Sequence, residues 1–135
     1  MSLKRIIKLK EGIKDERARE IRQIEMQIQA LKKEVERIEA QAEDLNEKIK
    51  AEFSYELLIR YRALLSTKKE ILLELARLDE LKRSKKQDLR EVYRDIKALE
   101  TIKLKADWEE RRKSLSLELR DTEFMHLIKE RMGLK

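Results

Sequence analysis

The fold is decided by residues 21–49, which read IRQIEMQIQALKKEVERIEAQAEDLNEKI. Their apolar side chains recur at alternating steps of three and four residues. The members of this first ladder are Ile21, Ile24, Ile28, Leu31, Val35, Ile38, Ala42, Leu45 and Ile49. Such spacing places one apolar seam along an α-helix that winds around another helix. The stretch therefore predicts one strand of a coiled coil.

A second, longer ladder follows a short break at residues 50–56. It keeps the same alternation through Leu57, Tyr61, Leu64, Lys68, Ile71, Leu75, Leu78, Lys82, Lys85, Leu89, Val92, Ile96 and Leu99. We predict an all-α fold in which two long helices form an antiparallel coiled-coil hairpin, with the second helix longer. The expected bounds are about 3–51 for the first helix, 52–55 for the turn and 56–131 for the second helix, all in one hairpin domain over 1–135.

The ends of these helices carry capping signals. Ser2 suits the N-cap of the first helix, and Ser54 suits the N-cap of the second, with Glu56 in its first turn. If Ile49 lies opposite Leu57, Ile28 lies opposite Leu78. A register seven residues longer also satisfies the geometry, but we favour the tighter one because it needs a shorter loop and uses Ile6, Leu9 and Ile13.

Near the N-terminus the ladder changes its step. From Ile13 to Ile24 the spacing is eleven residues, one hendecad, which predicts a small shift of the seam. With this shift Ile6, Leu9 and Ile13 pair with residues near the far end of the second ladder.

The composition fits long helices. Charged residues make up 46% of the chain and aromatic residues 4%, with no proline and two glycines. The absence of cysteine excludes disulfides and thiolate chemistry. No apolar run approaches the roughly 20 residues that span a membrane, and residues 1–9 do not read as a signal peptide. We expect a cytoplasmic protein.

The sequence offers little for catalysis. The single histidine, His126, lies in a charged helical segment, and no cluster of metal-ligating residues or glycine-rich phosphate loop is present. Two paired helices also provide no concave pocket. We therefore expect a protein that is not an enzyme and binds neither a cofactor nor a metal.

Three lysines occupy positions of the second ladder: Lys68, Lys82 and Lys85. A lysine stem can lie along an apolar seam while its charge stays at the edge, and such residues disfavour competing pairings. The alternative is a local weak point that allows the hairpin to bend.

An apolar strip lies beside the seam near the hairpin tip. Leu58, Leu65 and Leu72 fall at the heptad position next to the core, and Ile59 and Leu73 fall at the solvent-facing position. Such a strip suggests docking of another protein, although a third helix or a second copy would explain it equally well.

Beyond about residue 105 the second helix outlasts the first. This overhang carries Trp108, Leu115, Leu119, Phe124, Leu127, Ile128 and Met132, and the basic residues Arg111, Arg112 and Lys113. We expect a helix that docks on a partner through its aromatic anchors, rather than a frayed tail. The net charge of +6 is spread over several helix faces, so we expect only nonspecific, salt-sensitive contact with nucleic acid.

Three segments give the chain a family resemblance. Residues 3–11 (LKRIIKLKE) with Ala18 and Ile21, residues 58–65 (LIRYRALL) with Ile71, and residues 99–103 (LETIK) with 118–121 (ELRD) and Phe124 resemble the FliJ family. That family comprises small coiled-coil proteins of the flagellar type III export apparatus. The family's aromatic segment after the turn is reduced here to Tyr55 and Tyr61.

The resemblance implies a non-catalytic, stalk-like export protein. Such a protein binds the hexameric export ATPase, links it to the membrane export gate protein and escorts export chaperones. It would be cytoplasmic and peripheral to the inner membrane through the export complex. We expect the chain itself to be a monomer. Ile6, Leu9, Ile13 and the residues after Leu99 would face the ATPase, and Leu58, Tyr61, Leu65 and Leu72 would face the gate or chaperones. The alternatives are a coiled-coil adaptor or homodimer unrelated to secretion and, third, a basic helical nucleic-acid binder.

Overall fold

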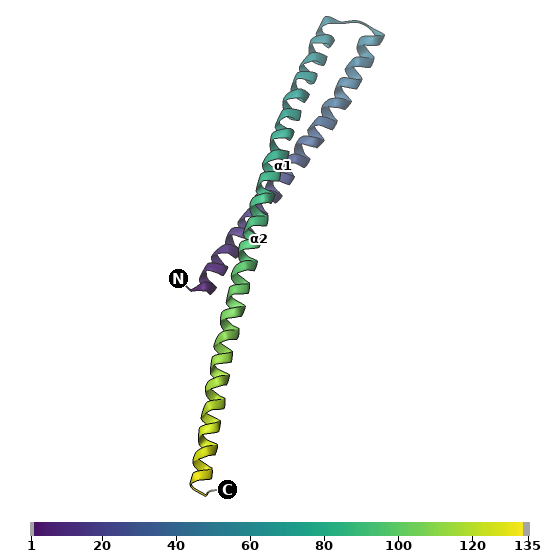
Figure 1. Cartoon of the computed structure of the whole chain (residues 1–135). Coiled ribbons are helices and arrows are strands. Elements are labelled where there is room, and N and C mark those ends of the chain that lie inside the picture. Colours follow the sequence, from purple (N-terminus) through teal and green to yellow (C-terminus); the bar gives the residue numbers. More distant parts are fainter. Residues whose placement is uncertain (1, 134–135) are drawn as a thin grey trace. The chain divides into compact units, whose positions relative to one another are not determined.

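The computed structural model describes residues 2–133 and contains two long helices. Helix α1 spans Leu3–Ala51 and helix α2 spans Tyr55–Arg131 (Figure 1). The chain reverses direction over residues 52–54, so the helices run antiparallel and pack against each other. The predicted all-α hairpin is confirmed, with 49 residues in α1 and 77 in α2.

Contacts divide the chain into two compact units. The first, which we call the central unit, consists of residues 12–92. The second, the terminal unit, joins the described residues before 12 to those after 92. Both helices therefore contribute to each unit, and each unit has its own packing.

The core of the central unit fixes the register of the two helices. Ile24, Ile28 and Leu78 form its most buried cluster, and Leu31 and Leu75 pack against it. Ile28 thus meets Leu78, as the shorter of the two predicted registers requires. The longer register would instead bring a lysine, Lys85, to Ile28.

The helix ends follow the sequence signals in part. Ser2 caps α1, since its Oγ accepts a hydrogen bond from the Arg5 N–H at 3.3 Å. At the start of α2 the Ser54 carbonyl accepts from the Leu58 N–H at 3.1 Å. The turn is closed by the rings of Phe53 and Tyr55, whose centroids lie 5.1 Å apart in an edge-to-face arrangement.

The predicted shift of the seam near the N-terminus is wrong. Leu9 is 56% exposed, whereas Ile7 is only 9% exposed. Ile7 lies two heptads before Ile21, so α1 keeps one uninterrupted heptad phase. The positions between them are filled by the half-buried side chains of Lys10, Lys14 and Arg17. Their long aliphatic stems cover the seam, so the helix needs no hendecad to bury it.

In the terminal unit the two helices are joined over a short length. Lys10 Nζ and Asp95 Oδ2 form an ion pair at 3.1 Å, and Ile7 and Ile96 are buried. From residue 104 to residue 133 every side chain is exposed except the half-buried Ile128. Residues 104–131 of α2 therefore form a single helix without a helical neighbour among the described residues, about 40 Å long at 1.5 Å per residue.

Candidate partner-binding surfaces

The seam lysines are satisfied inside the hairpin. Lys68 pairs with Glu39 at 3.1 Å, Lys82 with Glu25 at 3.4 Å and Lys85 with Glu20 at 2.9 Å. Their side chains are 31%, 28% and 28% exposed in the same order. Each stem therefore lies along the seam and each ammonium reaches an α1 carboxylate at its edge, as predicted.

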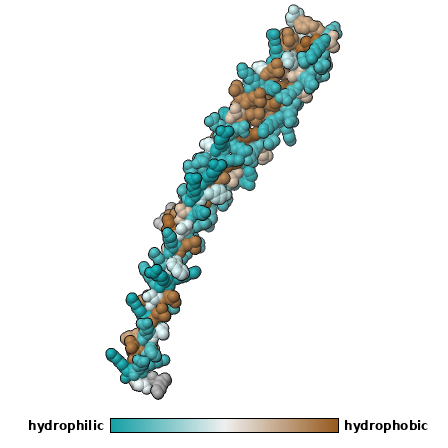
Figure 2. All heavy atoms as spheres, turned by 45° about the vertical axis from the view of Figure 1, so that its right-hand side comes forward, coloured by the Kyte–Doolittle hydropathy of each residue, from teal (hydrophilic) through white to brown (hydrophobic). Residues whose placement is uncertain are grey.

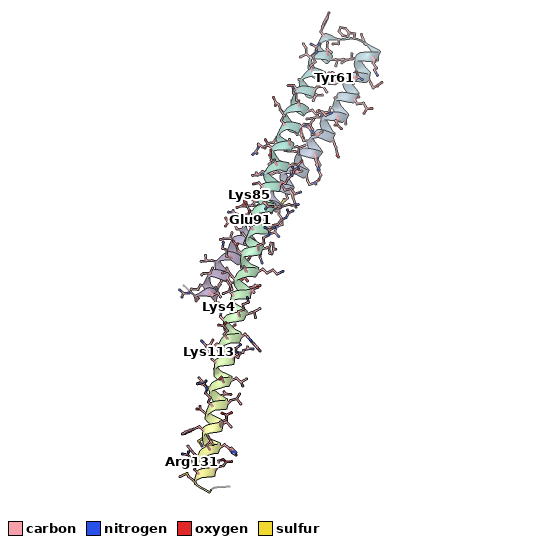
Figure 3. All side chains as sticks on the ribbon, viewed as in Figure 1. Lys4, Tyr61, Lys85, Glu91, Lys113 and Arg131 are labelled. Carbon is pink, nitrogen blue, oxygen red and sulfur yellow. The ribbon has the colours of Figure 1, made fainter. Side chains whose placement is uncertain are left out.

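The Lys85–Glu20 pair also changes an ionisation equilibrium. The hydrogen bond from Lys85 lowers the pKa of Glu20, and the nearby positive charge of Arg17 lowers it further. Glu20 thus lies between cations from both helices; Figure 3 marks the position of Lys85 on α2. These lysines stabilise the pairing of the two helices, so their ammonium groups are already engaged and are poorly placed to bind an outside ligand.

Charged residues on the outer faces pair within their own helix. Glu34 with Arg37 and Glu74 with Arg77 are spaced by three residues, and the arginine hydrogen bonds lower the pKa of each glutamate. The exposed His126 lies 3.4 Å from Glu130, one turn further along α2. The two arginine–glutamate pairs neutralise charge on the outer faces of the helices.

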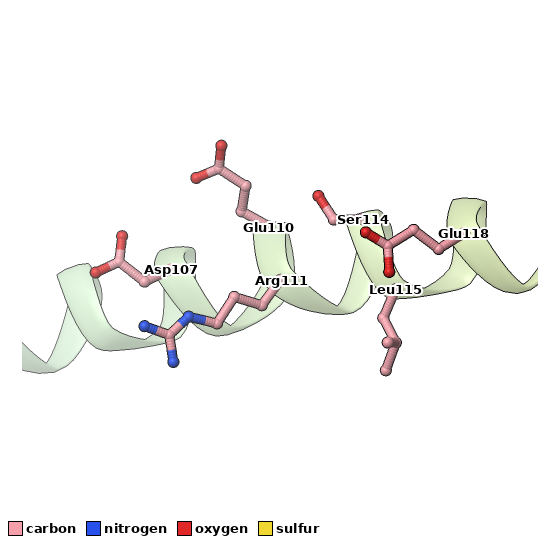
Figure 4. Close-up of a pocket in the computed structure, with 6 residues that line it drawn as sticks. All are labelled: Asp107, Glu110, Arg111, Ser114, Leu115 and Glu118. Atoms are coloured by element: carbon pink, nitrogen blue, oxygen red, sulfur yellow. The ribbon is translucent and has the colours of Figure 1, made fainter.

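The described residues contain no group of three or more His, Cys, Asp or Glu side chains placed to hold a metal ion. The hollow on the overhang is lined by residues of successive turns of one helix, Asp107, Glu110, Arg111, Ser114, Leu115 and Glu118 (Figure 4). With a single helix as its only wall, this depression lies open to water and offers a surface for binding rather than an enclosed site.

The predicted strip near the hairpin tip is largely exposed. Leu65 is 40% exposed and Leu72 47%, Ile59 and Leu73 are more exposed still, and Leu58 is half-buried. Tyr61, marked in Figure 3, is half-buried at its seam position and does not belong to the strip. Apolar side chains gather toward this end of the hairpin in Figure 2.

The turn adds two aromatic residues that were not predicted to belong to a binding surface. Phe53 and Tyr55 are both largely exposed, a few residues before the strip's first leucine, Leu58, in the sequence. Both residues lie in the break between the two ladders. This position could have predicted their exposure, because a residue outside both seams has no partner helix to cover it.

The overhang presents two apolar faces rather than one. Leu104, Trp108, Leu115 and Leu119 follow steps of four, seven and four residues, so they share one face, which we call the tryptophan face. Trp108 is 64% exposed, and Arg111 and Arg112 flank this face on its two sides.

Phe124 belongs to the other side of the helix. At about 100° per residue it points roughly 160° away from Trp108 and shares its face with Leu117 and Ile128. The predicted overhang residues are therefore not all brought together. Leu104 and Leu117, both exposed, were missed; their spacing from Trp108 and Phe124 was the signal.

The candidates from α1 contribute less apolar surface. Ile6 and Ile13 are half-buried against their own units, and Leu9 alone is largely exposed. The overhang and the tip strip thus remain the two principal candidate surfaces.

Comparison with known protein families, curated proteins and solved structures found no match to this chain. Neither helix, over the described residues, contains a segment apolar and long enough to cross a membrane.

Proposed function

We propose that this protein is a non-catalytic binding protein whose overhang docks on a protein partner. The observation that carries the proposal is the tryptophan face, Leu104, Trp108, Leu115 and Leu119, which the described part of the chain leaves exposed. Contiguous apolar surface on an ordered helix is unfavourable in water and typically marks a protein contact. An aromatic anchor with arginines beside it has the composition of an interface hot spot.

For the partner, we propose the hexameric export ATPase of a flagellar type III export apparatus. The support is the resemblance of residues 3–11, 58–65, 99–103 and 118–121 to the FliJ family, together with an unpaired helical end on a two-helix hairpin. In this role the protein is a stalk-like component that also links the ATPase to the export gate protein and escorts export chaperones. It works in the cytoplasm, held at the inner membrane through the export complex.

Trp108 makes the proposal measurable, because it is the only tryptophan of the chain. Titration with the purified hexameric export ATPase of the same organism is expected to shift the Trp108 emission to shorter wavelength as the ring becomes buried. The rate of ATP hydrolysis is expected to change in the same concentration range.

Two variants complete this experiment. Trp108→Ala is expected to weaken the effect on hydrolysis at least tenfold, as for a central anchor worth about 2 kcal/mol. Trp108→Phe keeps an aromatic ring and is expected to retain most of the effect on ATP hydrolysis. Absence of a complex at micromolar concentration and low salt would reject the export ATPase as the partner.

A further inference from the structure

The leucines of the tip strip form a straight line along the central unit. Leu58, Leu65 and Leu72 are separated by seven residues, or two helical turns, so they lie on one side of α2 about 10 Å apart. They stand next to the seam, where α1 covers them only in part. What borders this line determines which surface can cover it.

Close to the tip, the α1 edge of the line is acidic. Further from the tip, a groove on this side is lined by Asp79 of α2, seven residues after Leu72, and by α1 residues of both charge signs that include Gln29 and Lys32. Counting seven residues from these toward the tip gives Glu36 from Gln29 and Glu39 from Lys32. Glu43 continues the first series, and all three glutamates are exposed.

The opposite edge is basic. Arg62 follows Leu58 by one helical turn and Lys69 follows Leu65 in the same way, and both side chains are exposed. The structure records no ion pair for Glu36, Glu43, Arg62 or Lys69 with any described residue. This contrasts with the seam lysines, each of which has a carboxylate partner.

The two edges are also matched in height along the hairpin. The packing of Ile28 with Leu78 and the ion pair of Lys68 with Glu39 fix the register of α1 against α2. In that register Glu43 stands level with Arg62. One heptad further from the turn, Glu36 stands level with Lys69.

We propose that a second copy of this chain covers the strip, with the two hairpins parallel and in register. Rotation by 180° about an axis along the leucine line exchanges the left and right edges. Each leucine then meets its own counterpart, Arg62 faces Glu43 of the other copy, and Lys69 faces Glu36. An antiparallel arrangement would instead set basic edge against basic edge and acidic edge against acidic edge.

This dimer is weak and dependent on salt. A line of three leucines with flanking stems buries less than the roughly 1,000 Å² typical of a stable interface. The exposed ion pairs at its edges are screened as ionic strength rises. The strip lies outside the seam that pairs the two helices within one chain, so this association goes beyond the monomer that we expected from the sequence. The proposal does not depend on the identity of the partner at the overhang.

Sedimentation equilibrium of the full chain at rising protein concentration tests the association. In low salt the apparent mass is expected to rise from 16.3 kDa toward twice that value, and at about 0.5 M salt to return toward the monomer. A constant monomer mass up to several hundred micromolar in low salt would overturn the proposal.

Charge reversal tests the edges. The double variant Arg62→Glu with Lys69→Glu is expected to weaken dimerisation at least tenfold in low salt. Adding Glu36→Lys and Glu43→Lys in the same chain exchanges both edges and is expected to restore it. Unchanged association of the double variant, or failure of the fourfold variant to recover while its helix content is normal, contradicts the proposed pairing.

Single cysteines test the orientation, since the chain has none of its own. In a parallel dimer, Leu58→Cys and Leu72→Cys each form a disulfide with their own counterpart under mild oxidation. Ala63→Cys, which lines a groove with Gln41 and Leu64 on the other side of α2, is the matched control and is expected to cross-link much more slowly. Equal rates at all three positions, or linkage only in a mixture of the Leu58→Cys and Leu72→Cys chains, would refute the parallel arrangement.

Discussion

At the scale of single residues, charged side chains occupy places that the heptad pattern reserves for apolar ones. Lys68, Lys82 and Lys85 on α2 and Lys10 on α1 reach carboxylates on the opposite helix. Because these ion pairs remain partly exposed, each contributes little net stability. Their main effect is on pairing, since a shifted register would separate a half-buried ammonium from its carboxylate.

Glu20 gives this pairing a pH dependence. Its pKa in the folded state is lowered below the ordinary 4.5 by the hydrogen bond from Lys85, so its stabilising contribution is present above pH 4.5 and is lost as the pH falls through the folded pKa. We expect Glu20→Gln to lower Tm at pH 7 and to approach the wild-type Tm as the pH falls below the folded-state pKa of Glu20. Thermal melts followed by circular dichroism from pH 7 to pH 3 measure this difference.

The control for that series is Glu16→Gln, a change at a nearby exposed carboxylate. It removes the same charge from α1 without removing a bond to α2. A Tm difference that stays constant with pH for Glu20→Gln would show that the ion pair with Lys85 does not form in solution.

Gly12 is a second position where one residue limits stability. It lies inside α1, and an added Cβ would meet no atom within 4 Å. We expect Gly12→Ala to raise the free energy of unfolding by about 0.5–1 kcal/mol, because alanine loses less backbone entropy in a helix. Urea unfolding followed by circular dichroism measures the change.

Gly133 is the contrasting case for this substitution. Its φ of 68° follows the end of α2 in the left-handed region that alanine disfavours. Gly133→Ala is therefore expected to give no gain, and stabilisation by both changes would indicate an effect unrelated to helix entropy.

At the scale of the helices, the apolar ladders predicted most of the architecture. The seam from Ile21 to Ile49 and the turn near residue 53 follow from spacing alone. Spacing allowed two registers, and the packing of Ile28 with Leu78 in the structure selects the shorter one. The reading failed where polar residues fill the seam. Taking only apolar residues as seam members selected Leu9 and missed Ile7, since the stems of lysine and arginine were not counted as cover.

The corrected phase of α1 predicts opposite costs for two neighbouring residues. Ile7→Ala removes a buried side chain of the terminal unit and is expected to lower the free energy of unfolding by about 1–3 kcal/mol. Leu9→Ala removes an exposed side chain and is expected to change it by less than about 0.5 kcal/mol. Chemical denaturation of both variants measures these changes. A larger loss of unfolding free energy for Leu9→Ala than for Ile7→Ala would support the originally predicted hendecad shift of the seam.

At the scale of the whole molecule, surfaces were harder to predict than pairing. The ladder lengths showed that α2 continues alone, and composition showed that its end is rich in apolar side chains. Composition could not show that Trp108 and Phe124 lie on opposite sides, because this depends on angular phase within one helix. The heptad pattern of one helix also does not reveal that the two edges of the tip strip carry opposite charge. One edge belongs to α2 and the other to α1, so comparing them requires the register between the helices.

The difference between paired and unpaired helix predicts unequal protection of the backbone. An isolated helix of residues 104–131 lacks tertiary packing, so its hydrogen bonds open easily, whereas residues 21–49 are held by the core of the central unit. In hydrogen–deuterium exchange we expect peptides from 104–131 to exchange at least a hundredfold faster than peptides from 21–49. Binding of a protein partner to the tryptophan face is expected to slow exchange in 104–119 most. If the free chain protects both segments equally, the overhang is already covered in solution, and the face that carries the proposed function is not available to a partner.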